Sequence, residues 1–566
     1  MVRDALRFLA TPVRGFQSAV YVLAAAAVAS SLLALFRDRL FAHSFGAGME
    51  LDVYYAAFRI PDLIFVGIGA LVSVYVLIPE LARRNDLEQK HYIDIVSVGF
   101  SALAIIASIV AYLAAPRLLA LIFTELATGP LFADLITLTR IMLIQPILLG
   151  FSNILAAVTQ SRHRYTLYAL SPLVYNLGII IGIILFYPFL GLAGLAWGVV
   201  LGALLHAGIQ VPSLMQDGFF SASPRFDMTA FLRTISISVP RALALSVNQI
   251  TFIGLTVLAG TLATGSIAVF ILAFNLQAVP LAIIGASYSV AAFPSLSAAY
   301  AAGRRDEFLE QVAAAARHVL FWSIPAAALI IVLRAHMVRT VLGSGAFDWT
   351  DTRLTAAALA LFSLSLGAQG IMLLLIRGYY AAGRTLVPLI ISIGVGLATL
   401  LFAMLSLRFF ADQSMLYLLQ TFLRLEDVQG SLVVVLALSY SLAVTLGVYA
   451  LVIHFEFRFG RFVSKIRRTL WQSSVAACAA ALASYGALVL LGPLTLASTL
   501  ASVFLKGLAG GILGVVAAAF VYFILRNQEF FENFETVRRK LWREVKDEEA
   551  PIVVSSAEDV GQTTSQ

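Results

Sequence analysis

Charged side chains are scarce in this chain of 566 residues: Asp, Glu, Lys and Arg together make up 12%, whereas hydrophobic residues make up 60%. Soluble domains carry about 25% charged residues, so the composition excludes an ordinary soluble globule. The apolar excess runs along the whole chain, with a mean hydropathy of +0.93. Long apolar runs recur from Gln17 to Leu525. Each can cross a hydrocarbon core of about 30 Å, which takes about 20 helical residues.

Cysteine is almost absent, and the single Cys478 excludes an intrachain disulfide and a metal site built from cysteines. The seven histidines show no HExxH or similar metal spacing, and the chain has no GxSxG elbow and no Walker loop. We therefore expect neither an enzyme nor a bound cofactor or metal. The net charge of +7 does not indicate nucleic-acid binding, because Lys and Arg gather in short loops, as in cytoplasmic anchors.

The apolar runs predict an all-α polytopic membrane protein. Without water, backbone hydrogen bonds must be made within each segment, and repeated long apolar runs must therefore be helices. The predicted spans, about fourteen in number, are 17–36, 53–80, 93–115, 133–159, 165–188, 190–214, 231–259, 265–298, 309–333, 352–377, 386–407, 429–453, 469–492 and 499–525.

The distribution of Lys and Arg predicts that both termini lie in the cytoplasm, as an even number of spans requires. Basic residues gather in alternate loops, whereas the loops near 189, 260–264 and 493–498 have none. The predicted organisation is a cytoplasmic N-terminus (1–16), a six-helix lobe (17–214), a cytoplasmic linker (215–230), a second six-helix lobe (231–455), a basic cytoplasmic loop (456–468), a helix pair (469–525) and a cytoplasmic tail (526–566).

The chain repeats itself at an offset of about 216–220 residues. The matching segments are Phe58–Ala70 with Phe274–Ala286, Pro79–Arg84 with Pro294–Arg305, and Gln160–Arg164 with Tyr380–Arg384. Chance similarity among apolar segments is the alternative. A true repeat is favoured because loops and the Pro, Gly and Arg residues that interrupt the apolar runs recur in the same order. Six spans separate the copies, so the two lobes have the same orientation. Such parallel repeats are typical of alternating-access transporters.

Ionisable residues near the membrane are functional candidates, because charge in the bilayer is costly. Arg37 ends the first span, and Asp52 and Arg59 begin the second. We expect Arg37 and Asp52 to pair across the short loop, each lowering the other's cost of burial. Snorkelling of the arginines to the membrane surface is the alternative.

Arg241 follows Pro240 inside the seventh span and shares a helical face with Asn248 and Gln249. We expect this face to point into the bundle or a wet cavity; a structural contact between helices is the alternative for Arg241. Arg377, near a cytoplasmic end, is either a membrane anchor or a cavity residue. Other polar residues are expected to form hydrogen bonds between helices: Arg140, Gln145, Asn176, Asn275 and Gln277.

Six motifs, in order, resemble the MurJ/MviN family of lipid II flippases, part of the multidrug/oligosaccharidyl-lipid/polysaccharide exporter superfamily. They are Phe36–Asp52 (RD…FGAG…D), Phe58–Pro61, Thr139–Met142, Ser171–Asn176, Ser246–Ile250 and Arg377–Pro388. The resemblance implies two lobes around a cationic cavity, a C-terminal helix pair that forms a groove for a lipid tail, and a substrate linked to undecaprenyl pyrophosphate.

The resemblance also implies roles for individual residues. Arg37 and Arg59 would bind pyrophosphate, Asp52 would orient Arg37, and Arg241 would add positive potential from the second lobe. Several charged positions of the family are neutral in this chain: Ser31, Phe65, Val66, Ala70, Phe274 and Asn275.

The leading hypothesis is a flippase for lipid II in the bacterial cytoplasmic membrane, with the lipid-linked oligosaccharide and membrane lipid as its partners. An exporter of another lipid-linked oligosaccharide or small substrate on the same fold is the second hypothesis. A membrane scaffold that does not transport is the third, motivated by the neutral positions. The sequence assigns no coupling ion.

Overall fold

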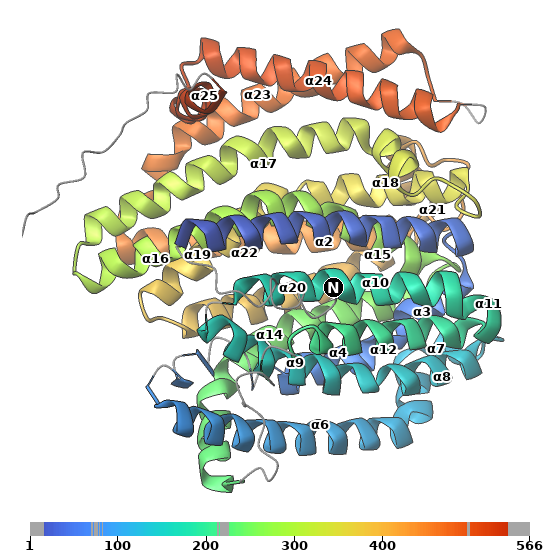
Figure 1. Cartoon of the computed structure of the whole chain (residues 1–566). Coiled ribbons are helices and arrows are strands. Elements are labelled where there is room, and N and C mark those ends of the chain that lie inside the picture. The colour runs from blue at the N-terminus through green and yellow to red at the C-terminus, as the bar shows by residue number, and fades with distance from the viewer. Residues whose placement is uncertain are drawn as a thin grey trace, which may run out of the picture.

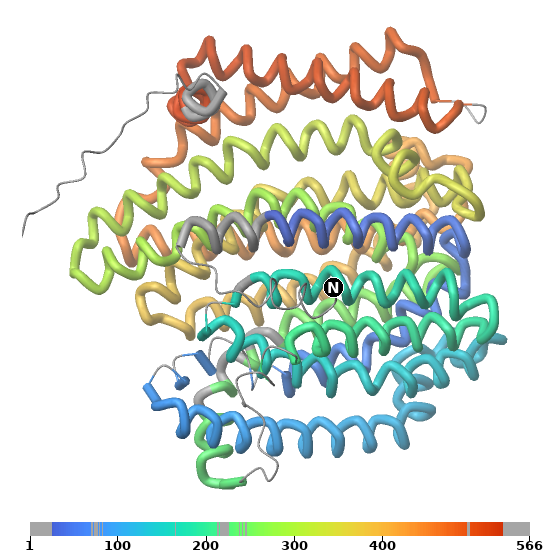
Figure 2. The backbone as a smooth tube through the Cα atoms, in the orientation of Figure 1, coloured from blue at the N-terminus to red at the C-terminus, as the bar shows by residue number. Residues whose placement is uncertain are grey.

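The computed structural model describes residues 16–69, 72, 77–78, 80–81, 83–162, 164–211, 214, 226–494 and 498–541. Every regular element in these residues is a helix, and most helices run side by side across the view in Figure 1. The tube in Figure 2 leads from the first lobe, in blue and teal, to the C-terminal pair, in red, at the upper edge.

The first lobe contains the helical elements α2 (Phe16–Phe45), α3 (Met49–Ala57), α4 (Arg59–Ile64), η1 (Phe65–Gly69), α6 (Asp86–Ile122), α7 (Thr124–Ala127), α8 (Phe132–Met142), α9 (Ile144–Ser161), α10 (Tyr165–Ile181), η3 (Gly182–Phe186), α11 (Tyr187–Leu190) and α12 (Leu192–Gly208).

The second lobe contains α14 (Met228–Gly260), α15 (Ser266–Leu281), η4 (Ala282–Ala286), α16 (Ser287–Ala301), α17 (Arg305–Val341), α18 (Trp349–Ser363), α19 (Leu366–Ala381), α20 (Leu386–Phe409), α21 (Gln413–Leu423) and α22 (Val433–Phe459). The remaining helices are α23 (Phe462–Leu491), α24 (Leu500–Ile524) and α25 (Gln528–Leu541).

The predicted fold class is confirmed. Within the described residues, nine helices are long and apolar enough to cross a membrane, and the pair α18–α19, bent by 46°, makes a tenth. The other predicted spans correspond to α2, to α3–α4–η1, and to α12 and α14, which are shorter, broken or only partly described. The protein is therefore a multi-pass membrane protein with two six-helix lobes and a C-terminal pair.

The internal repeat is visible in the backbone. Short π-helical segments, η1 and η4, end the two repeated motifs Phe58–Ala70 and Phe274–Ala286. The fourth span breaks at Leu143, between α8 and α9, and its counterpart in the second lobe breaks between α18 and α19. Because π-bulges are rare, their recurrence at matching places supports a true repeat.

Glycines allow α10 and α12 to pack closely in the first lobe. A Cβ atom added to Gly198 would lie 2.5 Å from the Cα atom of Gly182, and one added to Gly178 would lie 2.3 Å from the Cα atom of Gly202. Small residues at helix crossings are how membrane helices gain van der Waals contact, since lipid provides no hydrophobic drive between them.

The C-terminal pair packs on the second lobe, because α23 and α24 contact each other and α17. The basic loop predicted at 456–468 differs from what we find: α22 runs to Phe459 and α23 begins at Phe462. The basic residues there extend helices beyond the apolar spans, and Lys and Arg are good helix formers. The limits of the other predicted domains stay predictions.

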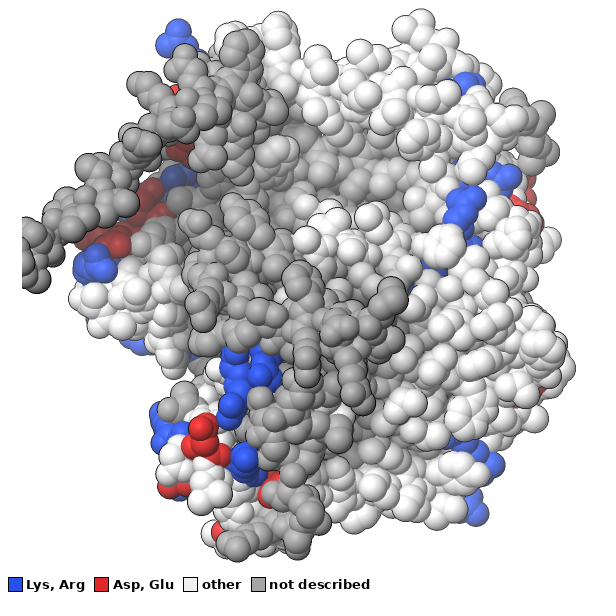
Figure 3. Space-filling view, in the orientation of Figure 1, with Lys and Arg blue, Asp and Glu red and all other residues white. Residues whose placement is uncertain are grey.

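Charged side chains gather at the two ends of the bundle. On the face in Figure 3, blue and red atoms lie toward the left and right edges, and the described surface between them is mostly white. An uncharged belt between two charged rims is the surface expected of a protein embedded in a bilayer.

Candidate substrate cavity and inter-lobe seal

A cavity of about 610 Å³ lies between the lobes and mostly against the second. We call it the central cavity. Its described lining is Phe65, Val66, Gly69, Asn153, Asn248, Gln249, Thr251, Phe252, Leu255, Phe274, Leu281, Gln369, Met372, Leu373, Ile376, Ser392, Val395, Gly396, Thr399, Tyr440 and Val444.

The polar lining of the central cavity consists of amides and hydroxyls, and no lining residue in the described part of the chain is charged. Asn153 of α9 and Asn248 of α14 belong to different lobes. Asn248 and Gln249 line the cavity as the helical-face prediction required. Three neutral positions noted in the sequence, Phe65, Val66 and Phe274, line it as well.

Arg59 is buried beside the central cavity, with 5% of its surface exposed. Its guanidinium lies 5.1 Å from the ring centroid of the cavity-lining Phe252, and its Nε donates to the Tyr55 carbonyl oxygen at 3.0 Å. Asp62 interacts with both Arg59 and Gln249. A carboxylate and a cation–π contact therefore stabilise the charge of Arg59.

Arg37 pairs with Asp38 and not with Asp52, so the expected Arg37–Asp52 pair is wrong. The Nη2 and Nε atoms of Arg37 lie 2.7 and 3.0 Å from Asp38 Oδ1. Arg37 Nη1 donates to Asn176 Oδ1 at 2.8 Å, and Asn275 Nδ2 donates to Asp38 Oδ2 at 3.0 Å. Asn275 belongs to the second lobe, so this chain of hydrogen bonds joins the lobes, as expected for Asn176 and Asn275.

Asp52 instead caps a helix of the opposite lobe. Its two carboxylate oxygens accept from the backbone N–H groups of Gly265 at 2.6 Å and Ala268 at 2.8 Å, at the N-terminus of α15. Asp52 is 4% exposed, and the free N–H groups and dipole of a helix N-terminus stabilise a buried carboxylate. Asp52 therefore holds the two lobes together and does not orient Arg37.

More hydrogen bonds join the lobes at the same end of the bundle. Ala47 N donates to Asp351 Oδ2 at 2.9 Å, and Ala346 N donates to the His43 carbonyl oxygen at 2.9 Å. Arg39 Nη1 donates to the carbonyl oxygen of Thr340 at 2.6 Å. We call these contacts, together with those of Asp52 to Gly265 and Ala268, the inter-lobe seal.

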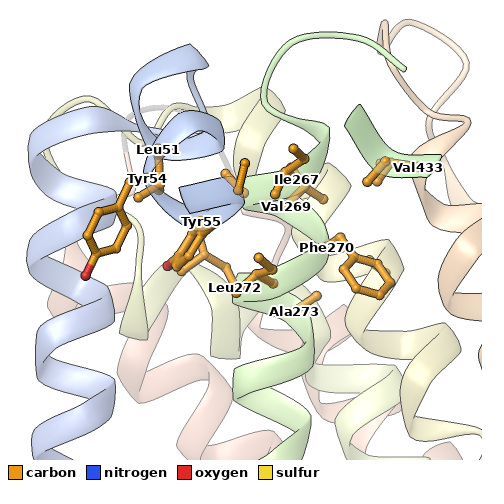
Figure 4. Close-up of a cluster of buried hydrophobic side chains, with 14 of the residues drawn as sticks. Leu51, Tyr54, Tyr55, Ile267, Val269, Phe270, Leu272, Ala273 and Val433 are labelled. Carbon is orange, nitrogen blue, oxygen red and sulfur yellow. The ribbon is translucent and has the colours of Figure 1, made fainter. Parts of the chain in front are cut away.

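An apolar cluster lies directly behind the inter-lobe seal. In Figure 4, Tyr55 of α3 lies beside Leu272 of α15, whereas Tyr54 points away from α15, and its ring lies 4.6 Å from that of Phe41 on α2. Burial of such side chains from both lobes excludes water, so the seal closes one end of the bundle.

The remaining residues named in the sequence analysis lie outside the cavity lining or outside the described residues. Arg241 lies in α14, but its side chain is outside the described residues, as is Ala70. Arg377 is half-buried on α19 next to the lining residue Ile376, and is not itself part of the described lining. Ser31 donates to the Ala27 carbonyl oxygen of its own helix.

Two of the residues expected to bond between helices are also located. Arg140 donates to the Tyr112 carbonyl oxygen on α6, as expected. The amide of Gln277 is fully buried and has no hydrogen-bond partner within the described residues, so the expected contact is not formed there.

The sequence did not predict Asp38 as the partner of Arg37, or Gly265 as a partner of Asp52. Asp38 was available as the neighbour of Arg37, but adjacent residues on a helix do not face each other. Gly265 carries a local signal, a glycine directly before a helix, and its φ of 88° is in the left-handed region. Nothing local connects it to Asp52.

The family model of the lipid II flippase MurJ matches residues 41–509, which include most of both lobes. The chain belongs to this family. A lipid II flippase MurJ from Burkholderia cenocepacia is 26% identical over 384 residues, covering 65% of this chain and 74% of the relative. A probable lipid II flippase MurJ from Thermotoga maritima is 27% identical over 369 residues, covering 63% of this chain and 73% of the relative.

Two solved structures share the fold of this chain. A lipid II flippase MurJ in an inward closed conformation matches with a TM-score of 0.72 and 21% identity. The match covers 90% of this chain and 100% of that structure's chain. An inward-facing multidrug resistance MATE family transporter matches with a TM-score of 0.58 and 16% identity, covering 75% of this chain and 96% of that one.

Proposed function

We propose that this protein translocates lipid II, a peptidoglycan precursor carried on undecaprenyl pyrophosphate, across the bacterial cytoplasmic membrane. The family match over residues 41–509 carries the proposal. The relative from Burkholderia cenocepacia is named a lipid II flippase. Translocation moves a lipid between leaflets without making or breaking a covalent bond, so the proposal includes no enzymatic step, cofactor or metal.

The proposed mechanism is alternating access. The inter-lobe seal closes one end of the bundle, and the central cavity lies between the two lobes. Breaking the seal while the opposite ends of the lobes approach would present the cavity to the other side of the membrane. The Lys/Arg distribution supports an orientation in which both termini are cytoplasmic and the seal is extracytoplasmic.

Arg37, Arg59, Arg241 and Arg377 are the proposed contacts for the pyrophosphate, because a guanidinium forms bidentate, charge-assisted hydrogen bonds with phosphate oxygens. Arg59 lies beside the cavity, since it packs on the lining residue Phe252. Movement of the lobes would separate Asp38 from Asn275 and open the interface beside Arg37, whose partners Asp38 and Asn176 both belong to the first lobe. The glycan would meet the amides and hydroxyls of the cavity.

The neutral lining favours a second candidate, an exporter of a less anionic lipid-linked oligosaccharide. Phe65, Val66 and Phe274 line the cavity at positions where the family resemblance implies charge. Amides and hydroxyls form hydrogen bonds with sugar hydroxyl groups, which lipid II and other lipid-linked oligosaccharides both carry. The two candidates differ in which lipid is moved and share the fold and the seal.

Reconstitution in liposomes with labelled lipid II tests the proposal. Arg59→Gln should lower the translocation rate by roughly 10- to 150-fold, the equivalent of one charge-assisted hydrogen bond of about 1.5–3 kcal/mol. Arg140→Gln is the matched control, because Arg140 contacts α6 and does not line the cavity. If folded protein moves another lipid-linked oligosaccharide and not lipid II, the second candidate replaces the first. If neither lipid moves, a scaffold that does not transport remains.

A further inference from the structure

Helix α21 is an addition to the repeated six-helix unit. In the first lobe, only Gly191 separates α11 from α12, whereas residues 410–432 separate α20 from α22 in the second lobe and contain α21. In Figure 1, α21 lies at the right-hand end of the bundle, beside α18. Asp412 caps the helix by accepting from Ser414 N at 2.9 Å and from Met415 N at 3.3 Å. The six-span unit is complete without α21, so the packing of the lobe does not by itself account for this helix.

One face of α21 packs on the second lobe. Leu423 is buried, and Leu419 is partly buried, against the apolar cluster behind the inter-lobe seal. Gln420 Nε2 donates to Ser431 Oγ at 2.8 Å. These contacts fix the rotation of α21 about its own axis, and they therefore decide which of its residues face outward.

A second face of α21 is apolar and exposed. Met415, Leu418 and Phe422 follow one another at positions i, i+3 and i+7, so they form one stripe along the helix. Their exposed fractions are 36%, 63% and 83%. Apolar side chains exposed to water to this extent are unfavourable, so the stripe needs an apolar occupant.

The apolar stripe continues a lipid-facing surface of α20. At the end of α20, every fourth residue is a large apolar side chain that is more than half exposed: Leu397, Leu401, Leu405 and Phe409. Helix α20 is long and apolar enough to cross the membrane, so this exposed row faces lipid. The row ends at Phe409, and α21 begins at Gln413.

The third face of α21 is polar and borders a charged rim. Gln413, Tyr417 and Thr421 recur at every fourth position and are exposed. Just beyond the helix, Arg353 of α18 pairs with Asp427 at 2.7 Å. A helix with one apolar and one polar exposed face, placed between a lipid-facing row and a charged rim, is typical of the boundary between headgroups and acyl chains.

We infer that α21 binds the lipid surface at the sealed end of the bundle, with the stripe of Met415, Leu418 and Phe422 among the acyl chains. Leu416 and Gln420 of α21 also line a cavity of about 620 Å³ with residues 261–263, which lead to Gly265 of the inter-lobe seal. The lipid-bound helix therefore anchors the second lobe next to the seal. The occupant of the stripe is lipid and not a soluble protein, because the stripe continues the lipid-facing row of α20.

Spin labelling of the full chain in nanodiscs tests lipid binding by α21. Cys478 is the sole cysteine, so Cys478→Ser gives a background for a nitroxide at Met415→Cys or at Phe422→Cys. In nanodiscs of phosphatidylglycerol and phosphatidylcholine, both labels should lie about 5–10 Å into the headgroup–acyl boundary, accessible to oxygen and protected from an aqueous nickel reagent. The matched control is Gln413→Cys. This position is exposed, lies two residues from Met415 on the opposite side of the helix, and should meet the nickel reagent.

The contribution of the stripe is tested with the label at Met415→Cys. Phe422→Ser should raise the nickel access of this label several-fold, whereas Thr421→Ser on the polar face should leave it unchanged. Unchanged access in Phe422→Ser would overturn the role of the stripe.

Three outcomes would overturn lipid binding itself. The first is equal nickel access at positions 413, 415 and 422. The second is protection of positions 415 and 422 from both oxygen and nickel, which indicates burial against protein. The third is spin–spin broadening that disappears when labelled protein is diluted with unlabelled protein, which assigns the stripe to a second copy of the chain.

Discussion

Replacing Asp52 by asparagine removes one negative charge from the inter-lobe seal and leaves the shape of the side chain almost unchanged. The carboxylate accepts from Gly265 N and Ala268 N at 2.6 and 2.8 Å. Asparagine keeps one acceptor and turns an N–H₂ group against the other backbone N–H. When the lobes separate, water solvates Asp52 and the α15 N-terminus, so the loss falls on the sealed state alone.

The expected loss is about 2–3 kcal/mol, because one charge-assisted hydrogen bond is removed and one backbone donor is left unpaired. The ratio of unsealed to sealed protein should therefore rise roughly 30- to 150-fold. Pulsed electron–electron distance measurements can follow this ratio in the Cys478→Ser background. Labels at Thr124→Cys in the first lobe and Gln413→Cys in the second occupy exposed positions at the sealed end.

Asp52→Asn should add a long-distance population that the parent protein lacks. The matched control is Glu50→Gln, which neutralises a carboxylate of the same helix that forms no hydrogen bond with α15 within the described residues. If the two variants give the same distance distribution, Asp52 does not stabilise the seal and the reasoning is refuted.

Three further substitutions test the packing between and within the lobes. Gly265→Ala would place a Cβ atom 1.8 Å from the Ala47 carbonyl oxygen, so it should prevent closure and shift the same distances to long values; a closed distribution contradicts this contact. Gly198→Val would drive a side chain into Gly182 and should cost about 1–3 kcal/mol, seen as a lower thermal midpoint of the purified protein. An unchanged midpoint would show that α10 and α12 can separate freely. Asn275→Leu leaves a buried carboxylate oxygen unpaired at a cost of about 1–3 kcal/mol and should also raise the long-distance population; an unchanged distance distribution contradicts a role for the Asp38–Asn275 bond in the seal.

The fold could be predicted because its determinants are local or repeated. Apolar length alone predicts spans, since each must satisfy its backbone within itself. The repeat of Phe58–Ala70 at Phe274–Ala286 predicts two lobes with the same orientation, and both copies end in a π segment. Helix ends were less predictable: α23 begins at Phe462, inside the stretch predicted as a loop, because charged residues can extend a helix into water.

The sequence singled out unusual charged residues and did not predict their partners. The sequence by itself identified Arg37, Asp52 and Arg59 as the unusual residues, because charge in an apolar segment is costly wherever the chain places it. Their partners were decided by tertiary structure: Asp52 bonds Gly265, 213 residues away, and Asp38 bonds Asn275, 237 residues away. Many different hydrogen-bond or ion-pair partners could stabilise a buried charge equally well. The approach of the two lobes selects one of them, and no sequence spacing records how separate helices dock.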